Sequence, residues 1–248
     1  MFLNRIFISC ALIFAFSLNV ASQDRIFFTL FPGISITAPI AGKLDLNLNS
    51  SAQYNTIGNK YEEKWFPAAF NYVDLQLSGI YKYNQSLQIS AAWYYRQSHP
   101  GTNTSFVENR FWQQITIISR VNNLRVRNRI RIEERLISSN GKADLLRWRL
   151  RYLAGIEIPL QGEKTDVREF YLTFSNEAYF NLSKPRNAIY SENWLSGLIG
   201  YRLTQLNRIE AGPVWQAQVR NPAGDFNHLF HLQVNLFIQL NLSKTKQT

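Results

Sequence analysis

Apolar and polar residues alternate with a period of two over most of the chain beyond residue 22, and no segment there follows a helical period. In 124–136 the apolar face carries Leu124, Ile130 and Leu136 among others, with Asn128 and Glu134 as exceptions. The opposite face is a ladder of charges: Arg125, Arg127, Arg129, Arg131, Glu133 and Arg135. Residues on alternating sides of an extended chain lie on opposite faces of a sheet, so the pattern predicts β-strands.

Ten segments of this kind, separated by clusters of Asn, Gly, Pro, Ser and Lys, are predicted as strands. They are 43–55, 66–80, 86–97, 106–120, 124–137, 145–158, 167–181, 192–204, 207–220 and 226–242. A further candidate lies at 26–37. Soluble strands average about 5–6 residues, whereas about 9–11 residues cross a bilayer when the strand is tilted. The length of these segments therefore favours a membrane barrel over a secreted sandwich.

The connections alternate in length, as they do in a transmembrane β-barrel. Those at 82–86, 121–124 and 205–207 are tight, whereas those at 56–65, 97–105 and 181–191 are longer and polar. Aromatic residues near strand ends suit the girdles at the two membrane surfaces. Ten strands would place both chain ends on the short-turn side. Adding 26–37 gives eleven strands, whereas single-chain bacterial barrels normally have an even number. Either 26–37 lies outside the wall or in the lumen, or the pattern has missed one strand. The expected count is therefore ten to twelve.

The first 22 residues have the pattern of a secretory signal peptide. Arg5 precedes an apolar run from Ile6 to Leu18, and small residues follow before Gln23. We therefore expect a signal peptide at 1–22, an N-terminal segment at 23–42 with a candidate extra strand, a barrel at 43–242 and a polar tail at 243–248. Cys10, the only cysteine, lies in the signal segment, which excludes a disulfide framework.

The polar face of the predicted strands is expected to line the lumen. If Asn122 and Asn123 form a two-residue hairpin turn, Thr116 faces Arg129, Gln114 faces Arg131, Trp112 faces Glu133 and Arg110 faces Arg135. A two-residue turn at 140–141 would pair an outward residue with an inward one, so a bulge or longer loop is expected between Leu136 and Leu145. The carboxylates available to the arginines are Glu108, Glu133, Glu157, Glu169, Glu177 and Glu210.

Two interpretations of this charged face stay open. It is a salt-bridged plug that stiffens a narrow barrel, or it is a binding strip for an anion such as a lipopolysaccharide phosphate, a fatty acid or an acidic solute. The candidate residues are Glu108, Arg110, Gln114, Arg125, Arg127, Arg129, Arg131, Glu133, Arg135, Arg147, Arg149, Arg151, Glu177 and Glu210. The net charge of +10 alone would also suit nucleic acid, but export and the lack of a recognition motif argue against that partner.

The sequence offers little for catalysis. A lipid hydrolase needs a serine activated by an oriented histidine. His99 falls in a predicted loop, His228 on the lipid-facing side and His231 on the lumen face beside Gln233. No calcium-type loop or other metal-binding pattern occurs, and we expect no cofactor.

Several short motifs indicate a family. They are Glu108-Asn-Arg110-Phe-Trp112-Gln113-Gln114, Arg129-Ile-Arg131-Ile-Glu133-Glu-Arg135, Arg147-Trp-Arg149-Leu-Arg151-Tyr152 and Asn176-Glu177. From about Leu44 to Leu240 the chain resembles domain of unknown function 2490, predicted bacterial outer-membrane barrels without an assigned activity. The resemblance implies the fold and the location but no chemistry.

The sequence therefore predicts an all-β, antiparallel up-and-down transmembrane barrel of ten to twelve strands in the outer membrane, preceded by a cleaved signal peptide. The expected function is non-enzymatic: the charged interior either has a structural role or binds an anionic lipid or solute. The alternative is a narrow channel for small anionic or amphipathic solutes. A barrel-type lipid hydrolase is less favoured. The expected partners are outer-membrane lipid or lipopolysaccharide and, by inference, the barrel-assembly machinery; the sequence does not give the oligomeric state.

Overall fold

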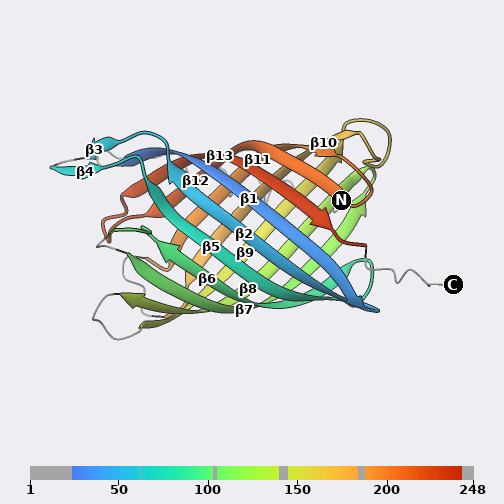
Figure 1. The fold of residues 1–248 in the computed structure, drawn as a ribbon, viewed down its shortest axis with the longest axis horizontal. Coiled ribbons are helices and arrows are strands. Elements are labelled where there is room, and N and C mark those ends of the chain that lie inside the picture. Colours follow the sequence, from blue (N-terminus) through green and yellow to red (C-terminus); the bar gives the residue numbers. More distant parts are fainter. Residues whose placement is uncertain (1–23, 62, 103–104, 140–144, 184–187, 242–248) are drawn as a thin grey trace, which may run out of the picture.

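The computed structural model describes residues 24–61, 63–102, 105–139, 145–183 and 188–241, which form a closed β-barrel of eleven strands (Figure 1). The wall strands are β1 (Arg25–Ala41), β2 (Leu44–Asn55), β5 (Phe70–Lys82), β6 (Leu87–Ser98), β7 (Phe106–Val121), β8 (Leu124–Ser139), β9 (Leu145–Pro159), β10 (Phe170–Asn181), β11 (Tyr190–Arg202), β12 (Asn207–Val219) and β13 (Phe226–Gln239). Among the described residues no helix is long and apolar enough to cross a membrane.

The alternation in the sequence gives a barrel that is polar inside and apolar outside. On β7, Phe111 and Ile115 are 54% and 50% exposed, whereas Glu108 on the other face is 2% exposed. On β8, Ile130 is 56% exposed and Arg131 is 8% exposed. Every wall strand carries at least one large, exposed apolar residue. This is the reverse of a soluble protein, in which the apolar face of a strand is the buried one.

The barrel closes through a parallel pair of strands. β1 pairs with β13 in parallel, from Arg25 opposite Asn227 to Thr37 opposite Gln239, and on its other side it pairs antiparallel with β2. The candidate strand at 26–37 is therefore part of the wall, and the expectation that it lies outside the wall or in the lumen is wrong. An odd strand count requires one parallel pair, because otherwise neighbouring strands alternate in direction. The barrel thus begins at Arg25 rather than at residue 43, and its last strand ends at Gln239.

The two ends of the barrel differ in their connections. The starts of β1 and β13 lie at the end that carries the connections at 56–69, 99–105, 140–144, 182–189 and 220–225. The other end carries the turns at 42–43, 83–86, 122–123 and 203–206, together with one longer connection at 160–169. We call these the long-loop end and the short-turn end. β1 starts at the long-loop end and β13 finishes at the short-turn end, so the expectation that both chain ends share one side is wrong.

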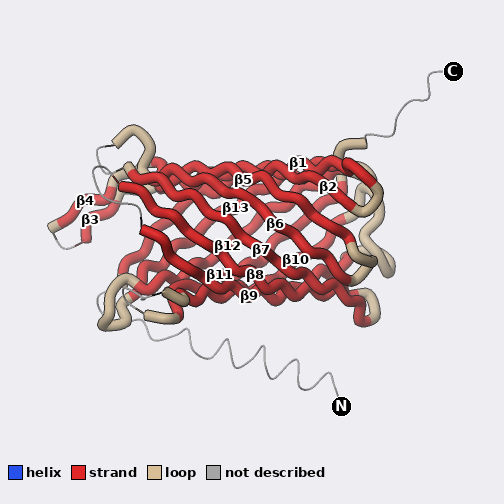
Figure 2. Tube along the Cα trace, turned by 90° about the horizontal axis from the view of Figure 1, so that it is seen from below, coloured by secondary structure: helices blue, strands red, loops and turns tan. Residues whose placement is uncertain are grey.

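The connection at 56–69 holds two short strands that the sequence did not indicate, β3 (Asn59–Tyr61) and β4 (Lys64–Phe66). They project from the long-loop end (Figure 2). The Tyr61 hydroxyl accepts a hydrogen bond from the Ile26 amide (2.7 Å) and donates one to the Ile26 carbonyl. The Tyr61 and Phe66 rings both pack on Phe27, at 5.5 Å between centroids. The small sheet thus satisfies backbone groups of β1 before its pairing with β2 begins.

The predicted register of β7 and β8 is confirmed. The turn at 122–123 places Thr116 opposite Arg129 and Gln114 opposite Arg131; the same register pairs Trp112 with Glu133 and Arg110 with Arg135. Asn122 takes a left-handed conformation (φ 53°), which asparagine tolerates better than most residues. Between β8 and β9, Glu134 pairs with Trp148, so a longer loop separates the strands and keeps both faces consistent, as expected; residues 140–144 of that loop lie outside the described residues.

Candidate functional site in the barrel interior

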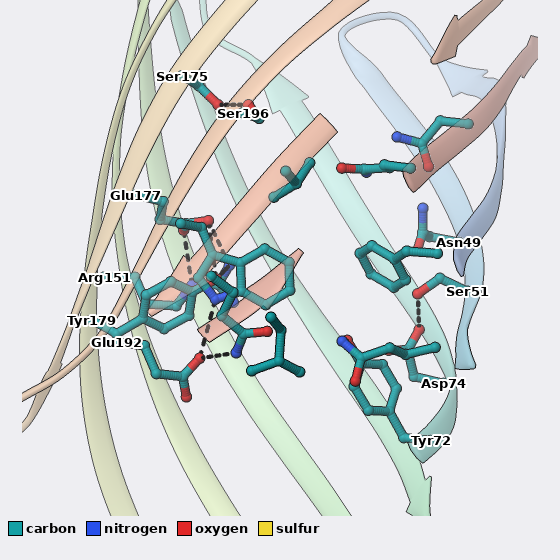
Figure 3. Close-up of a pocket in the computed structure, with 18 of the residues that line it drawn as sticks. Asn49, Ser51, Tyr72, Asp74, Arg151, Ser175, Glu177, Tyr179, Glu192 and Ser196 are labelled. Carbon is teal, nitrogen blue, oxygen red and sulfur yellow. Dashed lines mark hydrogen bonds and ion pairs between the residues drawn. The ribbon is translucent and has the colours of Figure 1, made fainter. Parts of the chain in front are cut away.

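The interior holds a cavity of about 760 Å³. Its lining reaches from His99 and Phe106 near the long-loop end to Arg208 and Phe237 near the short-turn end. Side chains from opposite parts of the wall point into it, with Arg151, Glu177, Tyr179 and Glu192 on one side and Asn49, Ser51, Tyr72 and Asp74 on the other (Figure 3).

Glu133 is the centre of the charged network. Its side chain is fully buried, and its carboxylate lies 2.6 Å from the Arg149 guanidinium, 2.8 Å from Arg151 and 3.6 Å from Arg131. The confirmed β7–β8 register and the β8–β9 register, which sets Glu133 opposite Arg149, produce this arrangement. A buried carboxylate is tolerated only when it is paired and hydrogen-bonded, and Glu133 meets that condition.

Two further glutamates extend the network along the barrel. Glu177 on β10 accepts hydrogen bonds from Arg129 (2.6 Å) and Arg151 (2.8 Å). Glu108 on β7 is held by Arg110 (2.8 Å) and also pairs with Arg135. Each of these carboxylates bridges two arginines, which joins β7, β8, β9 and β10 through their interior faces.

Aromatic rings fill the space between the guanidinium groups. Arg131 lies 3.9 Å from the Trp112 ring centroid, Arg110 lies 4.3 Å from Tyr94, and Arg151 lies 4.4 Å from Tyr179. A guanidinium over an aromatic face gains a cation–π attraction, which increases when both groups are desolvated. These contacts make this part of the interior dense.

A second polar cluster lies on β2, β5 and β6 and was not predicted. Asp74 accepts hydrogen bonds from Ser51 (2.6 Å), Tyr94 (2.7 Å) and Arg96 (3.1 Å). Asp45, which pairs with Lys82 at 2.5 Å, was likewise missed. Each is the one aspartate of its strand. The period-two pattern does place both on the lumen face, and this was the available signal.

The short-turn half of the interior is more loosely filled. Arg125 pairs with Glu157 (3.2 Å) and Arg208 with Glu210 (3.4 Å). Glu210 also accepts a hydrogen bond from the Tyr171 hydroxyl (2.8 Å). Arg127 is exposed to the cavity and makes no hydrogen bond or ion pair with another residue that the structure describes.

Most of the predicted interior residues come together, with one exception among the carboxylates. Gln114 accepts two hydrogen bonds from Arg131, and Arg147 lies opposite Arg135 in the β8–β9 register. Glu169 does not join the arginines. β10 begins at Phe170 rather than at residue 167, so Glu169 lies in the preceding connection, where it accepts a hydrogen bond from the Asp166 amide (2.8 Å).

The three histidines occupy different environments. His231 contacts the Thr29 hydroxyl through Nδ1 and Gln216 Oε1 through Nε2 (3.1 Å), joining β1, β12 and β13. Thr29 and His231 are 4% and 2% exposed and do not line the cavity.

The other two histidines lie at or near the long-loop end. His228 is 8% exposed, stacks on Trp215 and pairs with Asp24 (3.1 Å). His99 lies in the connection after β6, where burial, and then the charge of Lys64, lower the pKa of its ring. Among the described residues no group of three His, Cys, Asp or Glu side chains could hold a metal ion.

Comparison with known proteins gives one match. Residues 28–227 match the family described as "Protein of unknown function (DUF2490)". No curated protein and no solved structure matches the chain. The matched range covers more than half of the chain and includes the motifs on β7, β8, β9 and β10 that form the charged network. The chain therefore belongs to the DUF2490 family, and its fold is a closed eleven-stranded β-barrel.

Proposed function

We propose that the protein is a non-enzymatic barrel of the outer membrane whose charged interior binds an anionic lipid or solute. The observation that carries the proposal is the apolar exterior. Large exposed apolar side chains occur on all eleven wall strands, whereas a soluble monomer rarely exposes a contiguous apolar patch of more than a few hundred Å². Lipid is the environment in which such a surface is stable, and a closed barrel satisfies its backbone hydrogen bonds there.

The dimensions support the same conclusion. The wall strands are 12 to 17 residues long, and about 9–11 tilted residues cross the hydrocarbon core. The remaining length extends each strand into the headgroup regions. Trp148 and Phe170, near the two ends of the barrel, stay 36% and 42% exposed, which suits aromatic girdles. Lipid or lipopolysaccharide would be the surroundings, and the general assembly machinery of such barrels the expected partner.

The interior supports an anion as the ligand. The arginines on β8 exceed the carboxylates next to them, and Arg127 has no partner among the described residues. A narrow passage for small anions is the second candidate, because the cavity lining reaches both halves of the barrel. Steady anion-selective conductance in a planar bilayer would favour that passage over a binding role.

The proposal is tested by expressing the chain with its first 22 residues and separating the cell envelope by density. We expect the protein in the outer-membrane fraction, and on a mild-detergent gel we expect the unheated sample to migrate differently from the boiled one. A closed barrel resists the detergent until it is heated. Recovery as a water-soluble protein with no such shift would overturn the proposal.

A further inference from the structure

Arg127 makes no ion pair with any residue between 24 and 241 that the structure describes. The charges that act on it most strongly are those of three other arginines and one glutamate: Arg125, Arg129, Arg208 and Glu210. Those three arginines are themselves paired, with Glu157 (3.2 Å), Glu177 (2.6 Å) and Glu210 (3.4 Å) respectively. Because Glu177 also pairs with Arg151 (2.8 Å), arginines outnumber carboxylates here, and this part of the cavity carries a net positive charge.

A second nitrogen donor beside Arg127 is also without a hydrogen-bond acceptor. The Nε atom of Arg129 is buried and makes no hydrogen bond with the described residues, whereas Arg208 Nε lies 3.4 Å from Glu210 in their ion pair. A buried donor without a partner costs roughly 1–3 kcal/mol, so native proteins seldom leave one. An anion on Arg127 would lie beside a guanidinium group that still has an N–H donor to offer.

The chain also leaves space next to Arg127. The side chains that follow it across the sheet are small: Arg127 pairs with Gly155 on β9, Gly155 with Ser175 on β10, and Ser175 with Ser196 on β11. The two serine hydroxyls hydrogen-bond to each other at 2.7 Å, as the close-up shows (Figure 3). The cavity is lined by all four residues of this row, which are Arg127, Gly155, Ser175 and Ser196.

The facing part of the cavity wall carries apolar side chains among amides such as Gln233 and Asn235. In the ring of eleven strands, β8 lies opposite the β1–β13 pair. Cavity-lining residues there and on β11 and β12 include Phe31, Phe237, Leu198 and Val214. The cavity thus has a cationic side and a facing side on which apolar side chains are interspersed with amides. Its volume of about 760 Å³ falls within the 300–1,000 Å³ that is usual for small-molecule sites.

We infer that Arg127 anchors an amphiphilic monocarboxylate, of the chemical class of a medium- or long-chain fatty acid. Its carboxylate accepts the forked N–H groups of Arg127, and its hydrocarbon chain lies against Phe31, Leu198 and Val214. The Arg127 guanidinium can hold one carboxylate, and the apolar side chains across the cavity distinguish this ligand from a small inorganic anion. The inference rests on the proposed function, because it specifies the ligand of the same interior.

The test uses the full mature barrel, unfolded to remove bound lipid and refolded in a maltoside detergent. Octanoate labelled with ¹³C at the carboxyl carbon is titrated, and its carboxyl resonance reports binding. We expect saturable binding by the wild type and at least tenfold weaker binding by Arg127→Gln. Arg127→Lys keeps the charge but loses the fork and should bind with intermediate affinity. Lys164→Gln makes the same charge change on an exposed connection and should bind like the wild type.

Two further probes separate the contribution of the ligand's charge from that of its hydrocarbon chain. Butyrate keeps the charge but lacks most of the chain, and octanol keeps the chain but lacks the charge, so each should bind at least tenfold more weakly than octanoate. Equal octanoate binding by Arg127→Gln would overturn the anchor, and equal binding of butyrate or octanol would overturn the ligand class. A folded, heat-modifiable barrel that binds no octanoate overturns this site alone, whereas loss of the heat shift in the wild type overturns the proposed function.

Discussion

At the scale of single residues, charge pairing in the interior follows from position in the strand. Glu133 and Arg131 lie two residues apart on β8, so the period-two pattern places both on the interior face. The pattern does not give the partner on strands joined through longer loops. Asp74 and Glu192 therefore escaped notice, although one holds Arg96 and the other accepts hydrogen bonds from Trp194 and Gln216. Sequence reasoning recovered the arginines of β7, β8 and β9, and it missed Arg96 and part of the counter-charge.

Glu133→Gln should strongly destabilise the barrel without changing its fold. The substitution leaves three nearby guanidinium groups with one fewer carboxylate, and removing one partner of a buried ion pair costs roughly 3–5 kcal/mol. The measurement is the temperature at which the folded gel band disappears in detergent. Glu63→Gln is the matched control, because that side chain is 99% exposed and its effect should stay within about 0.5 kcal/mol. Equal melting of the two variants would contradict the central place of Glu133.

At the scale of elements, the sequence predicted most strand bounds to within a few residues, because turn chemistry and alternation agree at each hairpin. The two-residue turn at 122–123 even determined the register of β7 and β8. The closure could not be predicted in the same way. A strand's pattern shows which face is apolar but not which distant strand lies beside it, so the parallel pairing of β1 with β13 became visible only in the structure.

A disulfide test addresses this parallel closure. Ile34 on β1 and Leu236 on β13 are partners in the parallel register. Because Cys10 is the only natural cysteine and lies in the predicted signal segment, the double variant Ile34→Cys with Leu236→Cys should form one new crosslink, seen as a mobility change of the boiled, non-reduced protein. The pair Ile34→Cys with Leu232→Cys is displaced by four residues, about 13 Å along the strand, and should not crosslink. The reverse result would refute the parallel register.

At the scale of the whole molecule, the account depends on an inverted distribution of polarity. The interior carries the ion pairs around Glu133, and the exterior carries residues such as Ile115 and Ile130. The sequence indicated this inversion through strand length and alternating loop length. It did not show the division of the interior into a densely paired part and a part with an unpaired Arg127, because that division depends on which small side chains lie beside each arginine across the sheet.

Site-directed spin labelling tests the inverted barrel most directly. Single cysteines at Ile115 and Ile130 on the outer face, and at Arg127 on the inner face, are labelled in the refolded protein in lipid bilayers. We predict that dissolved oxygen, which concentrates in lipid, relaxes the labels at 115 and 130 more than a water-soluble nickel reagent does, and that the label at 127 shows the opposite preference. Nickel accessibility at 115 and 130 equal to that at 127 would contradict the barrel's position in the membrane.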